Sequence, residues 1–202
     1  HLYLQGVTTN LQEGSAMIIV GLERMEDSEN DNWEFRRVTK VETDADANRT
    51  KISFERPLGS NLPPSLPPQK CPKVYALRLR TALFGHNAPD WKTLPVALRI
   101  GEINPQTGRF NKGAFADGEH KWANHEFPND QRWIDLDAVY PQIAVGSWIV
   151  LSSVRYAELY QVTAVAEASC AKFTISGKAT RLTIDGEHLD KFSPRSGSVF
   201  AQ

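Results

Sequence analysis

The sequence predicts an all-β, mainly antiparallel protein with two tandem, related small barrel or sandwich modules joined by an irregular linker. Three observations support this: an internal repeat, apolar residues that alternate with polar ones, and turn-forming residues between the alternating segments. Alternation with a period of two places one face of a strand on a core and the other in water. The expected modules are residues 1–82 and 133–202, and residues 83–132 form the linker.

The internal repeat relates the beginning of the chain to its last third. The segment His1–Val20 aligns without a gap with Trp133–Ser152, so that Gly14 meets Gly146 just before a run of aliphatic residues. Three further pairs of segments follow in the same order: Glu34–Val41 with Glu158–Val165, Thr50–Glu55 with Thr180–Asp185, and Val74–Ala76 with Val199–Ala201. Four pairs in one order predict two copies of one strand arrangement.

Each repeated segment is expected to form a strand. Apolar and polar residues alternate along Lys51–Phe54 and along Arg181–Ile184. Gly14 and Gly146 each precede an aliphatic strand, where a turn that needs positive φ is expected. The Asp- and Asn-rich segment Asp44–Asn48 predicts a hairpin loop. One such module buries little core by itself, so we expect the two modules to pack together or to be held in a larger assembly.

Two irregular segments interrupt the repeat. The segment Arg56–Pro72 is rich in proline, which excludes a central strand and predicts an extended loop. A stiff connector is the favoured interpretation, and a docking segment for a partner is the alternative. Residues 83–132 show no strong periodicity, and ordered linkers of this length often contact another chain. We expect both segments to contact neighbouring subunits, with simple packing of the linker between the modules as the alternative.

The charge balance does not favour a polyanion as the partner. The formal net charge is −1, whereas nucleic-acid binding needs a surplus of Lys and Arg on one face. Acidic residues elsewhere balance the paired arginines, which we expect on solvated or protein-contacting faces: Arg36, Arg37, Arg78 and Arg80. We therefore expect no nucleic-acid partner.

Neither a targeting segment nor a membrane span is visible in the sequence. No apolar run approaches the length that crosses a bilayer, and His1–Gly6 does not resemble a secretory signal. The chain does not begin with Met and runs directly into patterned sequence, so we expect a fragment of a longer protein. Cys71 and Cys170 lie far apart in no metal-ligand spacing, and we expect two reduced thiols.

The segment Asp44–Glu55 partly matches a calcium-binding loop. Acidic or amide residues stand at ligand positions one, three, five and twelve. Arg49, however, replaces the glycine that makes the sharp turn of such a loop, and Thr50–Glu55 belongs to a repeated strand. A hairpin turn is the favoured interpretation, and weak calcium binding stays open.

Two other groups of polar residues are candidate sites. The spacing of the histidines in the first group is not that of a helical zinc pair, and a solvated loop is expected there. This first group comprises Asp117, Glu119, His120, His125 and Glu126. In the second group, His86 and Asp90 lack a Ser or Cys nucleophile pattern and are expected to form turns. We therefore predict no catalytic, cofactor-binding or metal-binding residues, and a protein that is not an enzyme.

Five segments resemble a known family when taken together: LYLQGVTTNLQEGSAMIIVG, WEFRRVTKVE, YALRLRTALFGHNAPDW, IDLDAVYPQIAVGSWIVL and ELYQVTAVAEASCAKFTISGKATRLTID. They are similar to the central region of the large baseplate assembly proteins of phage-tail-like extracellular contractile injection systems. The segments ALFGHNAP and LDAVYPQIAVGSW are the most specific, and the resemblance is weakest at Asn104–Gln131 and in the proline-rich loop.

The resemblance implies a structural role in the baseplate wedge. The implied partners are other wedge subunits, with no cofactor, no membrane insertion and no small-molecule substrate. The implied location is the cytoplasm during assembly and afterwards the particle, whether it stays in the cell or is released.

A carbohydrate-binding or cell-surface-binding module is the alternative function. Four tryptophans offer faces on which sugars stack: Trp91, Trp122, Trp133 and Trp148. Trp133 and Trp148 occupy repeated strand positions, however, and are more simply explained as core residues.

Overall fold

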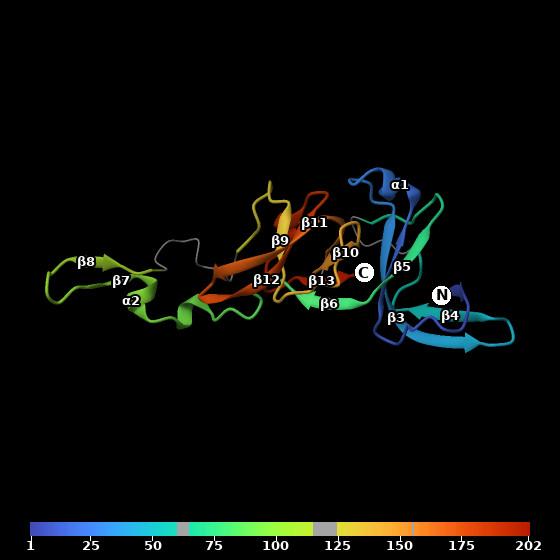
Figure 1. Ribbon diagram of the computed structural model, residues 1–202, viewed down its shortest axis with the longest axis horizontal. Helices are drawn as coiled ribbons and strands as arrows, with labels where there is room; N and C mark the ends of the chain where they lie inside the picture. Colours follow the sequence, from blue (N-terminus) through green and yellow to red (C-terminus); the bar gives the residue numbers. More distant parts are fainter. Residues whose placement is uncertain (60–64, 115–124, 155) are drawn as a thin grey trace.

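The computed structural model describes residues 1–59, 65–114, 125–154 and 156–202. These residues form antiparallel sheets, which confirms the predicted all-β class. The first sheet contains, in spatial order, β1 (Leu2–Gln5), β4 (Arg49–Phe54), β3 (Trp33–Asp44), β2 (Ala16–Val20) and β5 (Lys73–Leu77) (Figure 1). The second contains β6 (Leu79–Ala82), β13 (Ser198–Ala201), β10 (Trp148–Ser152), β11 (Ala157–Lys172), β12 (Ile175–Ile184) and β9 (Trp133–Asp135).

The remaining elements are short. A separate two-stranded hairpin pairs β7 (Gly101–Ile103) with β8 (Phe110–Lys112). The helical segments are α1 (Leu22–Glu26), η1 (Trp91–Thr93), α2 (Val96–Arg99) and η4 (Leu189–Lys191).

The strand pairing of the first sheet recurs in the second sheet at the level of single residues. The order β1-β4-β3-β2-β5 in the first sheet recurs as β9-β12-β11-β10-β13 in the second. The register recurs as well, because Ile18 pairs with Phe35 and the aligned Val150 pairs with Leu159. The aligned segments therefore form equivalent strands in two copies of one module.

The glycines of the repeat have the same role in both modules. Gly14 and Gly146 adopt positive φ values of 86° and 83°, which glycine adopts without the steric cost of a side chain. The N–H of Gly14 donates to the carbonyl oxygen of Val38 at 2.8 Å, and that of Gly146 donates to Val162 at 2.7 Å. Both acceptors stand where the register between neighbouring strands shifts, so each turn is joined to a β-bulge.

One strand lies in a different sheet from the expected one. The first module was expected to extend to residue 82, but β6 pairs with β13 and belongs to the second sheet. Alternation of apolar and polar residues continues from Tyr75 through Arg78 to Arg80. Because a change of sheet leaves this alternation intact, the sequence pattern does not reveal where the chain crosses from one module to the other.

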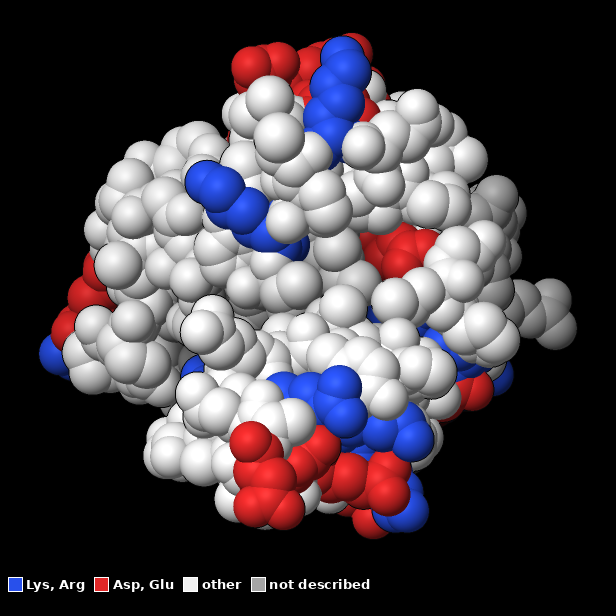
Figure 2. Space-filling model, turned by 90° about the vertical axis from the view of Figure 1, so that its right-hand side faces the viewer, with Lys and Arg blue, Asp and Glu red and all other residues white. Residues whose placement is uncertain are grey.

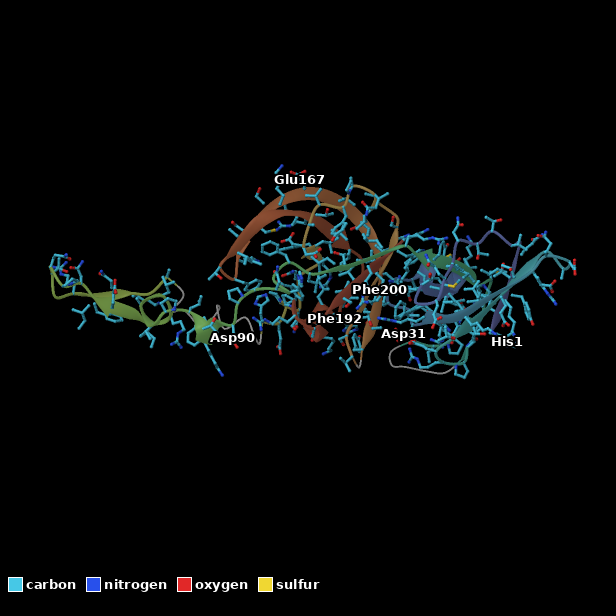
Figure 3. All side chains as sticks on the ribbon, turned by 90° about the horizontal axis from the view of Figure 1, so that it is seen from below. His1, Asp31, Asp90, Glu167, Phe192 and Phe200 are labelled. Carbon is cyan, nitrogen blue, oxygen red and sulfur yellow. The ribbon has the colours of Figure 1, made fainter. Side chains whose placement is uncertain are left out.

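Each module has a core of its own. The buried residues of the first are Met17, Val38 and Ile52, and partly buried apolar residues surround them. The larger core of the second module includes the equivalent residues Ile149, Val162 and Leu182, together with Leu83, Leu189 and Phe192. Phe192 lies on the concave side of the curved β11–β12 ribbon (Figure 3).

A third core, the seam, joins the two modules. It consists of Ala16, Ile18, Val20, Trp33, Phe35, Leu77, Trp148, Val150, Leu159 and Phe200. Phe200 lies between the sheets (Figure 3), with its ring centroid 5.1 Å from that of Phe35. Equivalent positions contribute from both sides, since Ala16 aligns with Trp148 and Ile18 with Val150. The seam therefore resembles the self-complementary interface of a twofold dimer within one chain.

Candidate assembly surfaces

The linker contains an arm, residues 89–114, that projects from the two modules. Figure 1 shows it reaching away from the second sheet, at the end opposite to the first module. Within the arm, the N–H of Gly113 donates to the carbonyl oxygen of Ile100 at 3.1 Å, and Arg99 Nε donates to that of Leu94 at 2.8 Å. Gly101 has a φ of 129°, and an added Cβ there would collide with the backbone of Asn111. The arm is thus a folded hairpin, which the sequence prediction of an irregular linker did not include.

The base of the arm is fixed to the tip of the β11–β12 ribbon. Ala88 and Phe173 are buried there, with Trp91 and Leu94 packed against them. Arg195 from the loop before β13 donates to the carbonyl oxygen of Ala88 at 2.5 Å. The orientation of the arm is therefore set by apolar packing and by a hydrogen bond to a distant loop.

Beyond this base, the arm exposes large apolar side chains. Ile103 is 67% exposed and Phe110 is 59% exposed, and these two residues pair across β7 and β8. Three more exposed apolar residues precede the hairpin: Val96, Leu98 and Ile100. Contiguous exposed apolar residues are typical of protein or membrane contact sites and of ligand grooves, whereas scattered single ones are normal on a protein surface.

The proline-rich loop, Arg56–Pro72, is held on its own module. The N–H of Gly59 donates to Oε1 of the buried Glu34 at 2.6 Å. Asn32 Nδ2 donates to the carbonyl oxygen of Pro67 at 2.9 Å. The described residues of the loop therefore support the stiff-connector interpretation, while residues 60–64 lie outside the described residues.

A buried ion pair lies under this loop and was not expected from the sequence. Arg36 was expected on a solvated or contacting face, but it is buried and lies 3.1 Å from Glu34. Its guanidinium also donates to the carbonyl oxygen of Pro57 at 3.2 Å, and burial lowers its pKa. Tyr160 occupies the equivalent position in the second module. The alignment of Arg36 with this buried aromatic residue is the sequence signal that could have revealed its burial.

The seam also carries polar contacts between the modules. Arg24 of α1 is buried, forms an ion pair with Asp185 at 3.2 Å and donates to the carbonyl oxygen of Leu159 at 2.8 Å. Two further arginines, Arg37 and Arg80, stack over the ring of Phe200 at 4.9 and 5.6 Å. The contacts of Arg24 and Arg37 join the two modules, whereas that of Arg80 lies within the second sheet.

A pocket of about 240 Å³ opens at the seam and has an acidic lining. It includes Asp31 from the first module and Glu158 and His188 from the second. Burial raises the pKa of Glu158, and Tyr156 donates a hydrogen bond to its carboxylate at 2.5 Å. Burial also raises the pKa of Asp31. Among the described residues, no group of three or more His, Cys, Asp or Glu is arranged to hold a metal ion.

The calcium-like segment Asp44–Glu55 forms a hairpin turn followed by β4, as the favoured interpretation expected. Asp44 accepts the N–H of Ala47 at 3.1 Å and forms an ion pair with Arg49 at 3.1 Å. The hydrogen bond from Ala47 is the main cause of the lowered pKa of Asp44. In Figure 2, the mixed acidic and basic side chains of this hairpin lie at the lower edge of the molecule. The carboxylate of Asp44 is therefore engaged by the turn itself.

The other candidate polar residues that the structure describes lie in separate places. The N–H of His86 donates to Leu83 in a turn, and Asp90 caps η1 by accepting the N–H of Lys92 at 2.9 Å. His125 packs its ring edge-on against Phe173, and burial lowers its pKa. Glu126 is exposed. Asp117, Glu119 and His120 lie outside the described residues.

Of the four candidate tryptophans, the three that the structure describes make intramolecular contacts. Trp148 is buried in the seam, as expected for a core residue. Trp133 is partly buried, with the guanidinium of Arg181 4.0 Å from its ring centroid, and Arg99 lies 5.2 Å from that of Trp91. Trp122 lies outside the described residues. These contacts compete with the stacking of a sugar on the rings of Trp91 and Trp133.

The comparisons with known proteins add no relative. No protein-family model, curated protein or solved structure matches the chain. In the part of the chain that the structure describes, no helix is both long and apolar enough to cross a membrane.

Proposed function

We propose that this protein is a structural component, whole or in part, of the baseplate of a phage-tail-like contractile injection system. Its role is to make protein–protein contacts with neighbouring wedge subunits, without catalysis and without a cofactor. It assembles in the cytoplasm and then remains part of the particle.

The arm is the observation that carries this proposal. Its outer part exposes five large apolar side chains on an element that the other described residues leave uncovered. Burial of apolar surface yields roughly 25 cal/mol per Å². A partner that covers these residues therefore gains affinity, because their apolar surface is exposed to water in the free chain. The fixed base of the arm supports this role, because a rigid contact element loses little freedom on docking.

The test replaces both outermost apolar residues of the hairpin, with the double variant Ile103→Ser and Phe110→Ser. We expect the melting temperature of the isolated chain to stay nearly unchanged, because both side chains are exposed. We expect particles assembled with the variant to be lost or incomplete by electron microscopy. Val145→Ser is the matched control, since Val145 is 64% exposed in a turn of the second module. Normal particles from the double variant would refute the proposal.

A further inference from the structure

The two modules differ by one strand. In the second module, residues 79–84 (the closing strand) pair with β13 on one side and reach the end of β9 on the other. The N–H of Phe84 donates to the carbonyl oxygen of Asp135 at 2.8 Å, and the N–H of Asp137 donates to that of Ala82 at 3.0 Å. The closing strand therefore connects both edges of the second sheet.

The first module has the same two edges, but no strand of the described residues lies between them. β5 aligns with β13 and ends the first sheet, and among the described residues no strand pairs with its outer edge. Residues along an antiparallel strand bond alternately to one neighbour and to the other. The N–H of Gly21 donates to the carbonyl oxygen of Asn32, which places the odd-numbered residues of β2 on the β3 side. Val74 and Ala76 of β5 consequently direct their N–H and C=O groups away from β2.

Val199 and Ala201 show what these backbone groups do in the second module. They occupy the positions of Val74 and Ala76, and they pair with Thr81 and Leu79 of the closing strand. The outer edge of β5 thus repeats the geometry of an edge that binds a strand in this same protein.

Side-chain burial shows the same difference. Val199 and Leu136 are fully buried in the second module, and Ile143 is 3% exposed. Their equivalents in the first module are all only partly buried: Val74, Leu4 and Leu11. Leu83 of the closing strand belongs to the same core as Val199, Leu136 and Ile143 of the second module. Where the second module has a strand, the first therefore leaves Val74, Leu4 and Leu11 partly exposed, and these three residues define what we call the groove.

We propose that the groove between β5 and the end of β1 binds an extended segment of a partner polypeptide, added antiparallel to β5. This deepens the proposed function by naming a second contact surface and the kind of segment that fills it. The segment carries apolar or uncharged side chains at alternate positions, as the closing strand does with Leu79, Thr81 and Leu83. Main-chain hydrogen bonds supply affinity in this mode of binding, and the alternate side chains supply specificity.

A partner segment fits this groove better than a second copy of the chain. The only described segment known to fit the equivalent groove is the closing strand, and in every copy it is already paired on both sides. Two copies joined through β5 would satisfy backbone groups, but the inward side chains of each β5 would still point into their own module.

The test uses a synthetic peptide with the sequence of residues 78–84, Arg-Leu-Arg-Thr-Ala-Leu-Phe, as the probe. It is added to the isotopically labelled full chain, and exchange of the backbone amides is followed by NMR. We expect the amides of Val74 and Ala76 to exchange at least about tenfold more slowly with the peptide, because only closed, hydrogen-bonded amides are protected. Amides of β13 should keep their rates.

Two controls isolate strand addition from simple apolar binding. The first is the same peptide methylated on the nitrogens of its Leu79 and Thr81 positions, which cannot donate to β5. The second is the Ala76→Pro chain, which lacks the outward N–H but keeps the bonds to β2. Protection should disappear in both. The methylated peptide keeps the experiment decisive even if the proline variant does not fold.

Three results would overturn the inference: no change in exchange, equal protection by the methylated peptide, or protection of β5 in the chain alone through dimers. The last result would assign the edge to a second copy. None of these results bears on the arm, so failure here is distinguishable from failure of the proposed function.

Discussion

Val74 and Val199 occupy the same position in the two modules, yet Val199 is fully buried whereas Val74 is only partly buried. Each pairs with the equivalent residue of the neighbouring strand, Ile19 in β2 or Leu151 in β10. The difference arises because β6 covers the edge of β13, whereas β5 ends its sheet. The repeat therefore gives matched pairs of residues whose surroundings differ by one strand.

Proline substitutions at one such pair, Ala76 and Ala201, should lower the free energy of unfolding by unequal amounts. Ala201→Pro removes an N–H that faces the closing strand, whereas Ala76→Pro removes one from an open edge. We expect Ala201→Pro to lower the free energy of unfolding by about 2 kcal/mol more than Ala76→Pro does, since a ladder bond is lost and the ring is crowded. Urea unfolding measures both, and equal losses would argue against an open β5 edge.

Replacing the glycines of another matched pair, Gly14 and Gly146, should instead lower the free energy of unfolding by equal amounts. Gly14 and Gly146 have nearly the same positive φ, and an added Cβ at either position meets no atom within 4 Å. The cost of Gly14→Ala and of Gly146→Ala is therefore set by the backbone alone, at about 1–3 kcal/mol each. Thermal unfolding of the two variants checks this, and a much larger loss at one glycine would contradict equivalent turns.

Glu158 should make stability depend on pH. Burial raises the pKa of Glu158 in the folded state, so unfolding releases a proton between its unfolded and folded pKa values. The contribution of Glu158 to stability is therefore most favourable below its pKa in the unfolded state. This contribution is lost as the pH rises through its pKa in the folded state. The groups that face it include Tyr156, which donates to it, and the charges of Asp31 and His188.

Glu158→Gln keeps the shape and an acceptor for Tyr156 but removes the titration. We expect the variant to be more stable than the natural chain at pH 8 and to lose that advantage at pH 4. Urea unfolding at the two pH values measures this. A constant difference between the two chains would show that Glu158 does not titrate differently on folding.

Calcium should leave stability unchanged at the β3–β4 hairpin. Asp44 is engaged by Ala47 and Arg49, and its pKa is lowered mainly by the hydrogen bond from Ala47. A bound ion raises stability by mass action, so we expect the same melting temperature with calcium as with a chelator. A rise of several degrees in calcium that Asp44→Ala abolishes would establish the weak site that the sequence left open.

Much of the fold could be predicted from the sequence, because local pattern and repetition reinforce each other. The alignment of Val74–Ala76 with Val199–Ala201 corresponds residue for residue to the pairing of β5 and β13 with their neighbours. The glycine turns were predictable for the same reason, since a required positive φ leaves a visible residue type.

Other features depend on contacts that sequence pattern does not encode. The crossing of the chain at Arg78 leaves the alternation unbroken, so β6 was assigned to the wrong module. The arm hairpin is built from very short strands, which give too few residues for a period to appear. The buried Arg36 depends on Glu34 and on a loop that folds back over it.

Amide exchange of the chain alone tests the central structural claim, that the first module lacks the strand that closes the second. Val199 and Ala201 should exchange only through global unfolding, because the closing strand pairs with them. Val74 and Ala76, on the open edge of β5, should exchange at least about a hundredfold faster in the same sample. Equal protection of the two pairs would contradict the account.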